Sequence, residues 1–212
     1  ETAFMPHYAL LLHGVHMHAW SMLPFARLLK ANDIEASVFG YYSVTRSIDA
    51  HCRALAQRVE AHYRRHDEPL HLVGHSLGGL VLRHFAAQYP KLVRGRIVTL
   101  GTPHQGSCIA HRLHQLAPFA LGKAYPEALN GSAPLPHPQI AWGSIAGNRP
   151  LGLGRVFALE GDNDGTVLLA ETYIDHLADH IVLPVSHTGM VMDKEVAAQT
   201  AYFLKNGCFK HE

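Results

Sequence analysis

Short apolar runs alternate with amphipathic segments along most of the chain. Runs of about four to eight apolar residues are typical of buried strands, and apolar positions three to four residues apart are typical of helices with one buried face. The runs predict strands at residues 8–12, 34–41, 70–73, 96–100, 140–146, 156–159 and 181–185. The amphipathic segments predict helices at residues 21–31, 47–66, 77–89, 110–116 and 194–204.

The segment 47–66 has a clear helical period. Ile48, Cys52, Leu55 and Val59 recur every three to four residues, and Ser47 stands where an N-cap is expected. Because parallel strands need crossover connections, strands separated by such helices predict an α/β protein with a mostly parallel central sheet and helices on both faces. Such sheets bind ligands beyond the carboxyl ends of their strands, so the residues that follow each strand are the first candidates for function.

The alternation of strands and helices breaks at residues 102–138. This stretch holds six of the twelve prolines, and only its residues 110–116 have a helical pattern. We expect it to be a short Pro-rich insertion within a single domain that spans residues 1–212, since a chain of this length forms one domain of ordinary size.

The composition is that of an ordinary globular protein and excludes several classes. Hydrophobic residues make up 48% and charged residues 17% of the chain, and the formal net charge is +1, so nothing suggests a nucleic-acid partner. No apolar run approaches the ~18 residues of a transmembrane segment. Three widely spaced cysteines favour a reducing, cytoplasmic setting, although export after removal of a signal peptide remains open.

The strand expected at residues 70–73 runs into a G-x-S-x-G sequence, with Gly74, Ser76 and Gly78 at the fixed positions. A strand before this pattern and a helix after it are typical of a nucleophilic serine on a sharp, strained turn. The turn exposes the Ser76 hydroxyl at the N-terminus of a helix, where the helix dipole favours a developing anion. The alternative interpretation is a tight turn whose serine only caps the helix.

Acyl transfer also requires two N–H donors that stabilise the oxyanion. We expect one to be the backbone amide of Leu77, directly after the serine. The other should come from the loop after the first strand, where Val15 follows His13 and Gly14. Gly14 could instead serve only to open that loop.

A serine nucleophile needs a histidine as base and a carboxylate that orients it. Among 18 histidines, His187 is favoured because it follows the last expected strand. Asp164 is the preferred carboxylate and Asp162 the second choice, because both lie on a loop between Ser76 and His187. A turn in which the Asp side chains bond their own backbone is the alternative. His176 and His180 could share a helix face, but no third metal ligand is evident, so we expect no metal and take both as surface residues.

Four stretches of the sequence resemble the α/β-hydrolases, specifically the small lipases and esterases. They are His13-Gly14 with the nearby Trp20; residues 74–79 (GHSLGG); residues 101–107 (GTPHQGS); and residues 163–167 (NDGTV) followed by residues 186–189 (SHTG). The resemblance implies the α/β-hydrolase fold, with Ser76 as nucleophile, Asp164 and His187 as its partners, and Val15 and Leu77 as oxyanion donors. It also implies that residues 103–138 are a cap or lid, which is too short and Pro-rich here to form a large helical lid.

The expected function is hydrolysis of a carboxylic ester through an acyl-enzyme, with no cofactor and a small-molecule ester or lipid-like compound as substrate. A thioesterase or acyltransferase with the same triad is the alternative, and a non-catalytic binding protein of the same fold is a third possibility. Apolar side chains of the insertion are candidates to bind the acyl group, or else they pack the insertion onto the core: Leu113, Leu116, Phe119 and Leu121. Activity should fall as His187 becomes protonated below about pH 6–7.

Overall fold

The fold is described by a computed structural model that covers residues 6–151 and 159–211. Its centre is a six-stranded sheet in the order β2-β1-β3-β4-β5-β6, in which every neighbouring pair is parallel. The predicted parallel sheet is therefore confirmed. The strands are β1 (His7–Leu12), β2 (Ile34–Phe39), β3 (Leu70–His75), β4 (Ile97–Leu100), β5 (Trp142–Gly147) and β6 (Asp179–Leu183).

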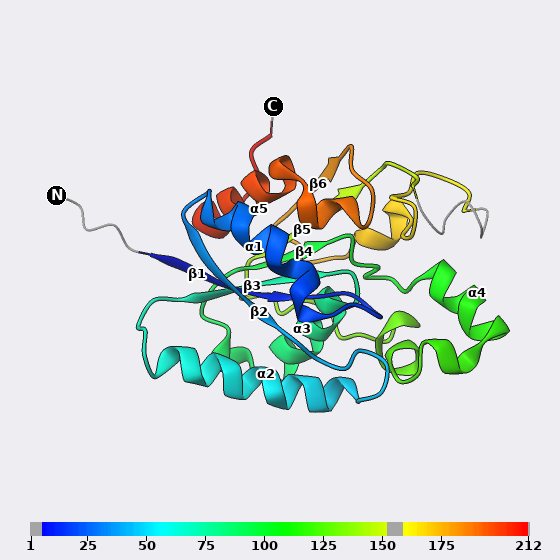
Figure 1. Cartoon of the computed structure of the whole chain (residues 1–212), viewed down its shortest axis with the longest axis horizontal. Coiled ribbons are helices and arrows are strands. Elements are labelled where there is room, and N and C mark those ends of the chain that lie inside the picture. The colour runs from blue at the N-terminus through cyan, green and yellow to red at the C-terminus, as the bar shows by residue number, and fades with distance from the viewer. Residues whose placement is uncertain (1–5, 152–158, 212) are drawn as a thin grey trace.

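Helices cover both faces of this sheet (Figure 1). One face carries α1 (Leu23–Lys30) and α5 (Lys194–Asn206), which contact each other, and the opposite face carries α2 (Ile48–Tyr63) and α3 (Leu77–Gln88). Each face has its own apolar core. Alternate residues of β1 point into different cores: Leu10 and Leu12 pack with α2 and α3, whereas Leu11 packs with α1 and α5. Because β1 is buried on both faces, its sequence is continuously apolar rather than alternating.

The helix ends follow the residues expected to cap them. The Ser47 hydroxyl accepts a hydrogen bond from the Ala50 amide at 3.2 Å, as predicted for the start of α2. At the start of α5, the Asp193 carboxylate accepts from the amides of Glu195 and Val196. The same helix ends at Gly207, which adopts the left-handed conformation common at this position.

Some elements differ from the sequence-based expectation. The last strand, expected at residues 181–185, runs over Asp179–Leu183, and a 3-10 turn at Ala19–Met22 precedes α1. The strand expected at residues 156–159 lies outside the described residues. No helix in the described ranges is long and apolar enough to cross a membrane.

The insertion between β4 and β5 contains α4 (Cys108–Leu116), a 3-10 turn (Pro118–Ala120) and a π-helical turn (Tyr125–Leu129). It lies at one end of the molecule (Figure 1). A buried side chain of α3, Arg83, ties both ends of this insertion to the core. Its guanidinium donates to the carbonyls of His104, Ala133 and Pro134 at 2.5–2.6 Å, and burial lowers the pKa of Arg83 to about 10.

Replacing Arg83 by Met should destabilise the protein by about 3 kcal/mol, because buried carbonyl groups would lose their charge-assisted donors. Urea denaturation measures this change. Arg53→Met is the matched control, since Arg53 is exposed on α2 and should change the free energy of unfolding by less than about 1 kcal/mol. Equal stability of the two variants would contradict a clamping role for Arg83.

Candidate active site

The turn between β3 and α3 holds Ser76 in an unusual backbone conformation, with φ 54° and ψ −121°. A non-glycine residue in this region is strained by about 1–3 kcal/mol, and such strain clusters at functional sites. The flanking glycines have no space for a side chain. A Cβ on Gly74 would lie 2.5 Å from the backbone of Gly78 and Gly79, and a Cβ on Gly78 would lie 2.7 Å from the Leu12 carbonyl oxygen.

Backbone hydrogen bonds hold the strained residue in place. The Ser76 amide donates to the Leu100 carbonyl at 2.8 Å. The Ser76 carbonyl accepts from the Thr102 hydroxyl at 2.9 Å and from the Gly79 amide at 3.1 Å. Ser76 is 7% exposed and directly precedes the first residue of α3. The β3 and β4 ends therefore fix the hydroxyl at the N-terminus of this helix.

A buried carboxylate and imidazole lie beside this turn. The His187 Nδ1 donates to the Asp164 Oδ2 at 2.7 Å, and the His187 amide donates to the Asp164 carbonyl at 2.8 Å. The other carboxylate oxygen of Asp164 accepts from the amides of Thr166 and Val167. Asp164 is 1% exposed, whereas Asp162, the second choice, is exposed to solvent. With Nδ1 directed at the carboxylate, the Nε2 of His187 remains to accept a proton.

His75 connects the serine turn to His187. Its Nε2 donates to the His187 carbonyl at 2.9 Å, and the centroids of the two rings are 4.7 Å apart. Gly101, at the end of β4, leaves space for the pair, because a Cβ there would lie 3.0 Å from both Asp164 Oδ2 and His187 Nδ1. Among the described residues no hydrogen bond joins Ser76 to His187. Such bonds are often long without substrate and shorten in the Michaelis complex.

The loop of residues 13–16, which we name the oxyanion loop after the role expected for Val15, passes next to the serine. A Cβ on Gly14 would lie 3.2 Å from the Ser76 Cβ. In the described part of the chain, no hydrogen bond occupies the amides of Val15 and Leu77. Both N–H groups thus remain available to a ligand.

The residues after β2 hold this loop in its conformation. The Tyr41 hydroxyl donates to the His13 carbonyl at 2.6 Å, and the rings of Tyr41 and His13 stack with their centroids 4.2 Å apart. The His16 amide donates to the Ser43 hydroxyl at 3.1 Å. Sequence reasoning missed Tyr41 and Ser43, because their contacts span 27 or more residues and follow no motif.

The apolar side chains expected to bind substrate have different environments. Leu121 is 3% exposed within the core beside α3, which corresponds to the packing alternative for that residue. Leu113 is partly buried against the same core, whereas Leu116 and Phe119 are 78% and 86% exposed on the insertion. A substrate-binding role for Leu113, Leu116 and Phe119 stays a prediction.

The histidines expected on a shared helix face are not on a helix. His176 lies in a turn with φ 70°, and His180 is partly buried in β6, where its Nε2 is 3.1 Å from the Thr172 hydroxyl. No group of three or more His, Cys, Asp or Glu side chains within the described ranges could hold a metal ion.

Two histidines near the site are buried and held in the neutral form. Burial, together with the neighbouring His187, lowers the pKa of His75 to about 3. Burial and the positive charge of Arg83 lower the pKa of His104 to about 3, and the His104 ring shares a hydrogen bond with the Thr99 hydroxyl. The unfolded chain accepts protons at these histidines below about pH 6.5, whereas the folded protein does not.

Stability should therefore fall as the pH drops below about 6.5, by up to about 1.4 kcal/mol per pH unit for each of these two histidines. Urea denaturation at several pH values between about 7 and 5 measures the slope. His104→Gln should reduce the slope, and Gln88→Ala, which removes no titratable group from an exposed position of α3, should leave it unchanged. If the two variants showed the same dependence of stability on pH, the account of His104 as a buried, neutral histidine would be contradicted.

The parallel sheet, the strained serine turn and the buried carboxylate–histidine pair together define a serine hydrolase of the α/β-hydrolase fold. The chain belongs to the family described as serine aminopeptidase, S33, whose model matches residues 7–139.

Solved structures with this fold include enzymes of several activities. The mature lipase BlEst2 of Bacillus licheniformis is 16% identical, with a TM-score of 0.74 over 98% of this chain and 94% of that one. The metagenomic carboxyl esterase MGS0156 is 13% identical, with a TM-score of 0.69 over 96% of this chain and 76% of that one. The RedJ thioesterase of Streptomyces coelicolor is 11% identical, with a TM-score of 0.59 over 98% of this chain and 87% of that one. At these identities the likeness concerns the fold.

Proposed function

We propose that the protein hydrolyses carboxylic esters by way of an acyl-enzyme on Ser76. The observation that carries this proposal is the buried Asp164–His187 pair beside a serine in a strained backbone conformation. A serine that only capped a helix would need neither the strain nor a buried carboxylate–histidine pair next to it.

In the first step, the Ser76 hydroxyl attacks the ester carbonyl while the Nε2 of His187 takes its proton. Asp164 stabilises the imidazolium that forms and keeps the proton of Nδ1 directed at its carboxylate. The amides of Val15 and Leu77 donate to the oxyanion of the tetrahedral intermediate. His187 then gives its proton to the departing alcohol, which leaves the acyl group on Ser76.

In the second step, water attacks the acyl-enzyme with His187 again as the base. The tetrahedral intermediate collapses, the Ser76 oxygen takes the proton back from His187, and a carboxylic acid leaves. No cofactor takes part in either step.

An aromatic groove beside the oxyanion loop supports a substrate with a planar or apolar group. This groove has a volume of about 680 Å³ and is lined by His13 together with His18, Trp20, Tyr41 and Tyr42. Trp20 and Tyr42 are each 68% exposed, so their rings are accessible to a ligand. Exposed aromatic side chains at the rim of a site bind apolar groups by burial of surface and by stacking.

Trp20→Ala should lower kcat/KM for 2-naphthyl acetate about tenfold through KM, because one wall of the groove is removed. Ethyl acetate, with the same acyl group and no ring, should be hydrolysed at a nearly unchanged rate. Tyr202→Ala is the control, since Tyr202 is an exposed aromatic residue on α5. An equal loss on both esters would contradict binding of the aryl group by this groove.

Thioester hydrolysis and acyl transfer to an alcohol use the same triad chemistry, and the family description names an aminopeptidase. A panel of p-nitrophenyl esters of increasing chain length, acyl thioesters, acceptor alcohols and aminoacyl p-nitroanilides separates these activities. We expect the highest kcat/KM on an ester. A preference for thioesters or anilides by more than about tenfold would replace the ester assignment.

A further inference from the structure

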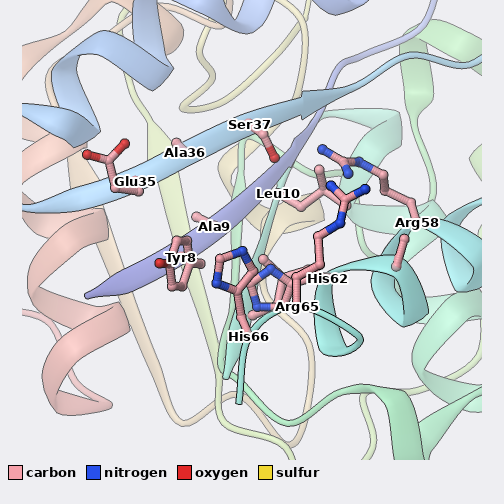
Figure 2. Close-up of a pocket in the computed structure, with 12 residues that line it drawn as sticks. Tyr8, Ala9, Leu10, Glu35, Ala36, Ser37, Arg58, His62, Arg65 and His66 are labelled. Carbon is pink, nitrogen blue, oxygen red and sulfur yellow. The ribbon is translucent and has the colours of Figure 1, made fainter. Parts of the chain in front are cut away.

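A pocket lies between α2 and the neighbouring strands β1 and β2, of which β2 is the edge strand (Figure 2). We call it the α2–β2 pocket. Its residues on the strands, such as Tyr8 and Glu35, come near the amino ends of β1 and β2, whereas Ser76 follows the carboxyl end of β3. Because all strands are parallel, this pocket is separate from the proposed ester site.

The narrow pocket lies over strand backbone. Ala61 of α2 lines it with a small side chain, whereas Ala9 of β1 and Ala36 of β2, whose side chains pack on the opposite face of the sheet, line it with main chain, and its volume is about 260 Å³. That volume is near the lower end of the range for small-molecule sites, about 300 Å³. It suits a compact group rather than a large ligand.

Arg58 of α2 and Arg65, in the turn that follows this helix, line the pocket, and their guanidinium groups lie toward the same end of it, near Ser37 (Figure 2). In the described part of the chain neither guanidinium group makes a hydrogen bond or an ion pair. Glu35, the one acidic residue among the described residues that line the pocket, lies at the other end in Figure 2 and pairs with Lys30 at 3.3 Å. Two unpaired guanidinium groups beside a hydroxyl form a donor set that an anion would satisfy.

Aromatic rings form the opposite wall. The Tyr8 ring lies 5.1 Å from that of His62 and 4.6 Å from that of His66, and the two histidine rings stack at 4.8 Å. The His62 Nε2 donates to the Glu68 carbonyl at 3.1 Å, and burial, with Arg58 and His66 nearby, lowers the pKa of His62. Arg58 and Arg65 stay protonated near neutral pH and supply positive charge to the pocket.

We propose that the α2–β2 pocket binds a phosphoryl group, held by Arg58 and Arg65 with the Ser37 hydroxyl as a further donor. A phosphomonoester carries nearly two negative charges and three acceptor oxygens, which match two guanidinium forks better than a single carboxylate does. The group belongs either to a small soluble phosphomonoester or to a phospholipid head group. Its binding does not depend on the ester hydrolysis proposed above.

Isothermal titration calorimetry of the purified protein with glycerol 3-phosphate and with inorganic phosphate tests whether the pocket binds a small soluble phosphate compound. Sedimentation with vesicles of phosphatidic acid in phosphatidylcholine, against phosphatidylcholine alone, tests the lipid form. The double variant Arg58→Gln/Arg65→Gln should weaken binding at least about tenfold, since both charge-assisted contacts are lost. Arg64→Gln makes a single charge change on an exposed residue at the end of α2 that does not line the pocket, and it should have little effect.

If the protein binds only the soluble phosphates and the double variant loses this binding, the ligand is a soluble phosphate compound. If the protein binds the vesicles of phosphatidic acid and the double variant loses that binding, the ligand is a lipid head group. The proposal is overturned if the protein binds neither the soluble phosphates, at concentrations up to about 10 mM, nor the vesicles of phosphatidic acid. Binding that persists in the double variant, or that is lost equally in Arg64→Gln, also overturns it. Ester hydrolysis by the double variant should equal that of the unmodified protein, so failure of one proposal is distinguishable from failure of the other.

Discussion

Ser76→Ala should lower kcat/KM for ester hydrolysis by about four to six orders of magnitude. The substitution removes the atom that forms the acyl-enzyme and leaves the oxyanion donors and the substrate groove in place. In the described part of the chain, the Ser76 hydroxyl makes no hydrogen bond, and alanine tolerates the turn no worse than serine does. The free energy of unfolding should therefore change by less than about 1 kcal/mol.

Steady-state hydrolysis of p-nitrophenyl esters by the purified variants measures the effect. Ser132→Ala is the matched control, because it removes the same hydroxyl from an exposed residue of the insertion. It should retain full activity. If Ser76→Ala keeps more than about a tenth of the activity of the unmodified protein, Ser76 is not the nucleophile.

Asp164→Asn should lower kcat by about four orders of magnitude, as expected when an orienting carboxylate is replaced by an amide. The asparagine oxygen can still accept from the amides of Thr166 and Val167. Its NH₂ group would then face the Nδ1 of His187, so the ring would carry its proton on Nε2 and could not accept one from Ser76. The loss should appear without unfolding of the protein.

Asp162→Asn provides the comparison within the same loop. Asp162 is exposed, and within residues 6–151 and 159–211 its backbone carbonyl accepts a hydrogen bond from the Leu169 amide, whereas its carboxylate accepts none. We expect its kcat to stay within about threefold of the unmodified value. Thermal denaturation of both variants checks that each is folded. A greater loss in Asp162→Asn than in Asp164→Asn would reverse the assignment of the carboxylate.

Much of the fold follows from local pattern. Strands buried on both faces, such as β1 and β4, are largely apolar, and helices such as α2 keep a regular apolar period and a capping serine. These signals predict a parallel sheet between helices, and the structure confirms it. The order of the strands in the sheet is set by long-range packing and is not written in any local pattern.

The proposed site was predictable where a residue type is required by backbone geometry. Gly74 and Gly78 must lack a side chain, so the pattern around Ser76 identifies the turn. The environments of the residues proposed to bind substrate were harder to predict. The periodicity of residues 110–116 shows that they form an amphipathic helix, but Leu113, Leu116 and Phe119 differ in exposure only because of what the rest of the chain covers.

The 18 histidines of the chain are explained in part by burial, which sequence cannot show. His75 and His104 are neutral, buried hydrogen-bonding groups around the proposed site. His13 stacks on Tyr41 to hold the oxyanion loop. Arg83 illustrates the same difficulty, since an arginine in a helix gives no sign in sequence that it will be buried against carbonyl groups about 50 residues away.

Labelling with a fluorophosphonate probe, followed by mass spectrometry of the peptides, tests the proposed catalytic serine most directly. Such a probe reacts with a serine only when a neighbouring base activates it. We predict a single adduct on the peptide that contains Ser76, lost in Ser76→Ala and strongly reduced in His187→Ala. No adduct on that peptide, or equal labelling of the protein and its Ser76→Ala variant, would contradict the account.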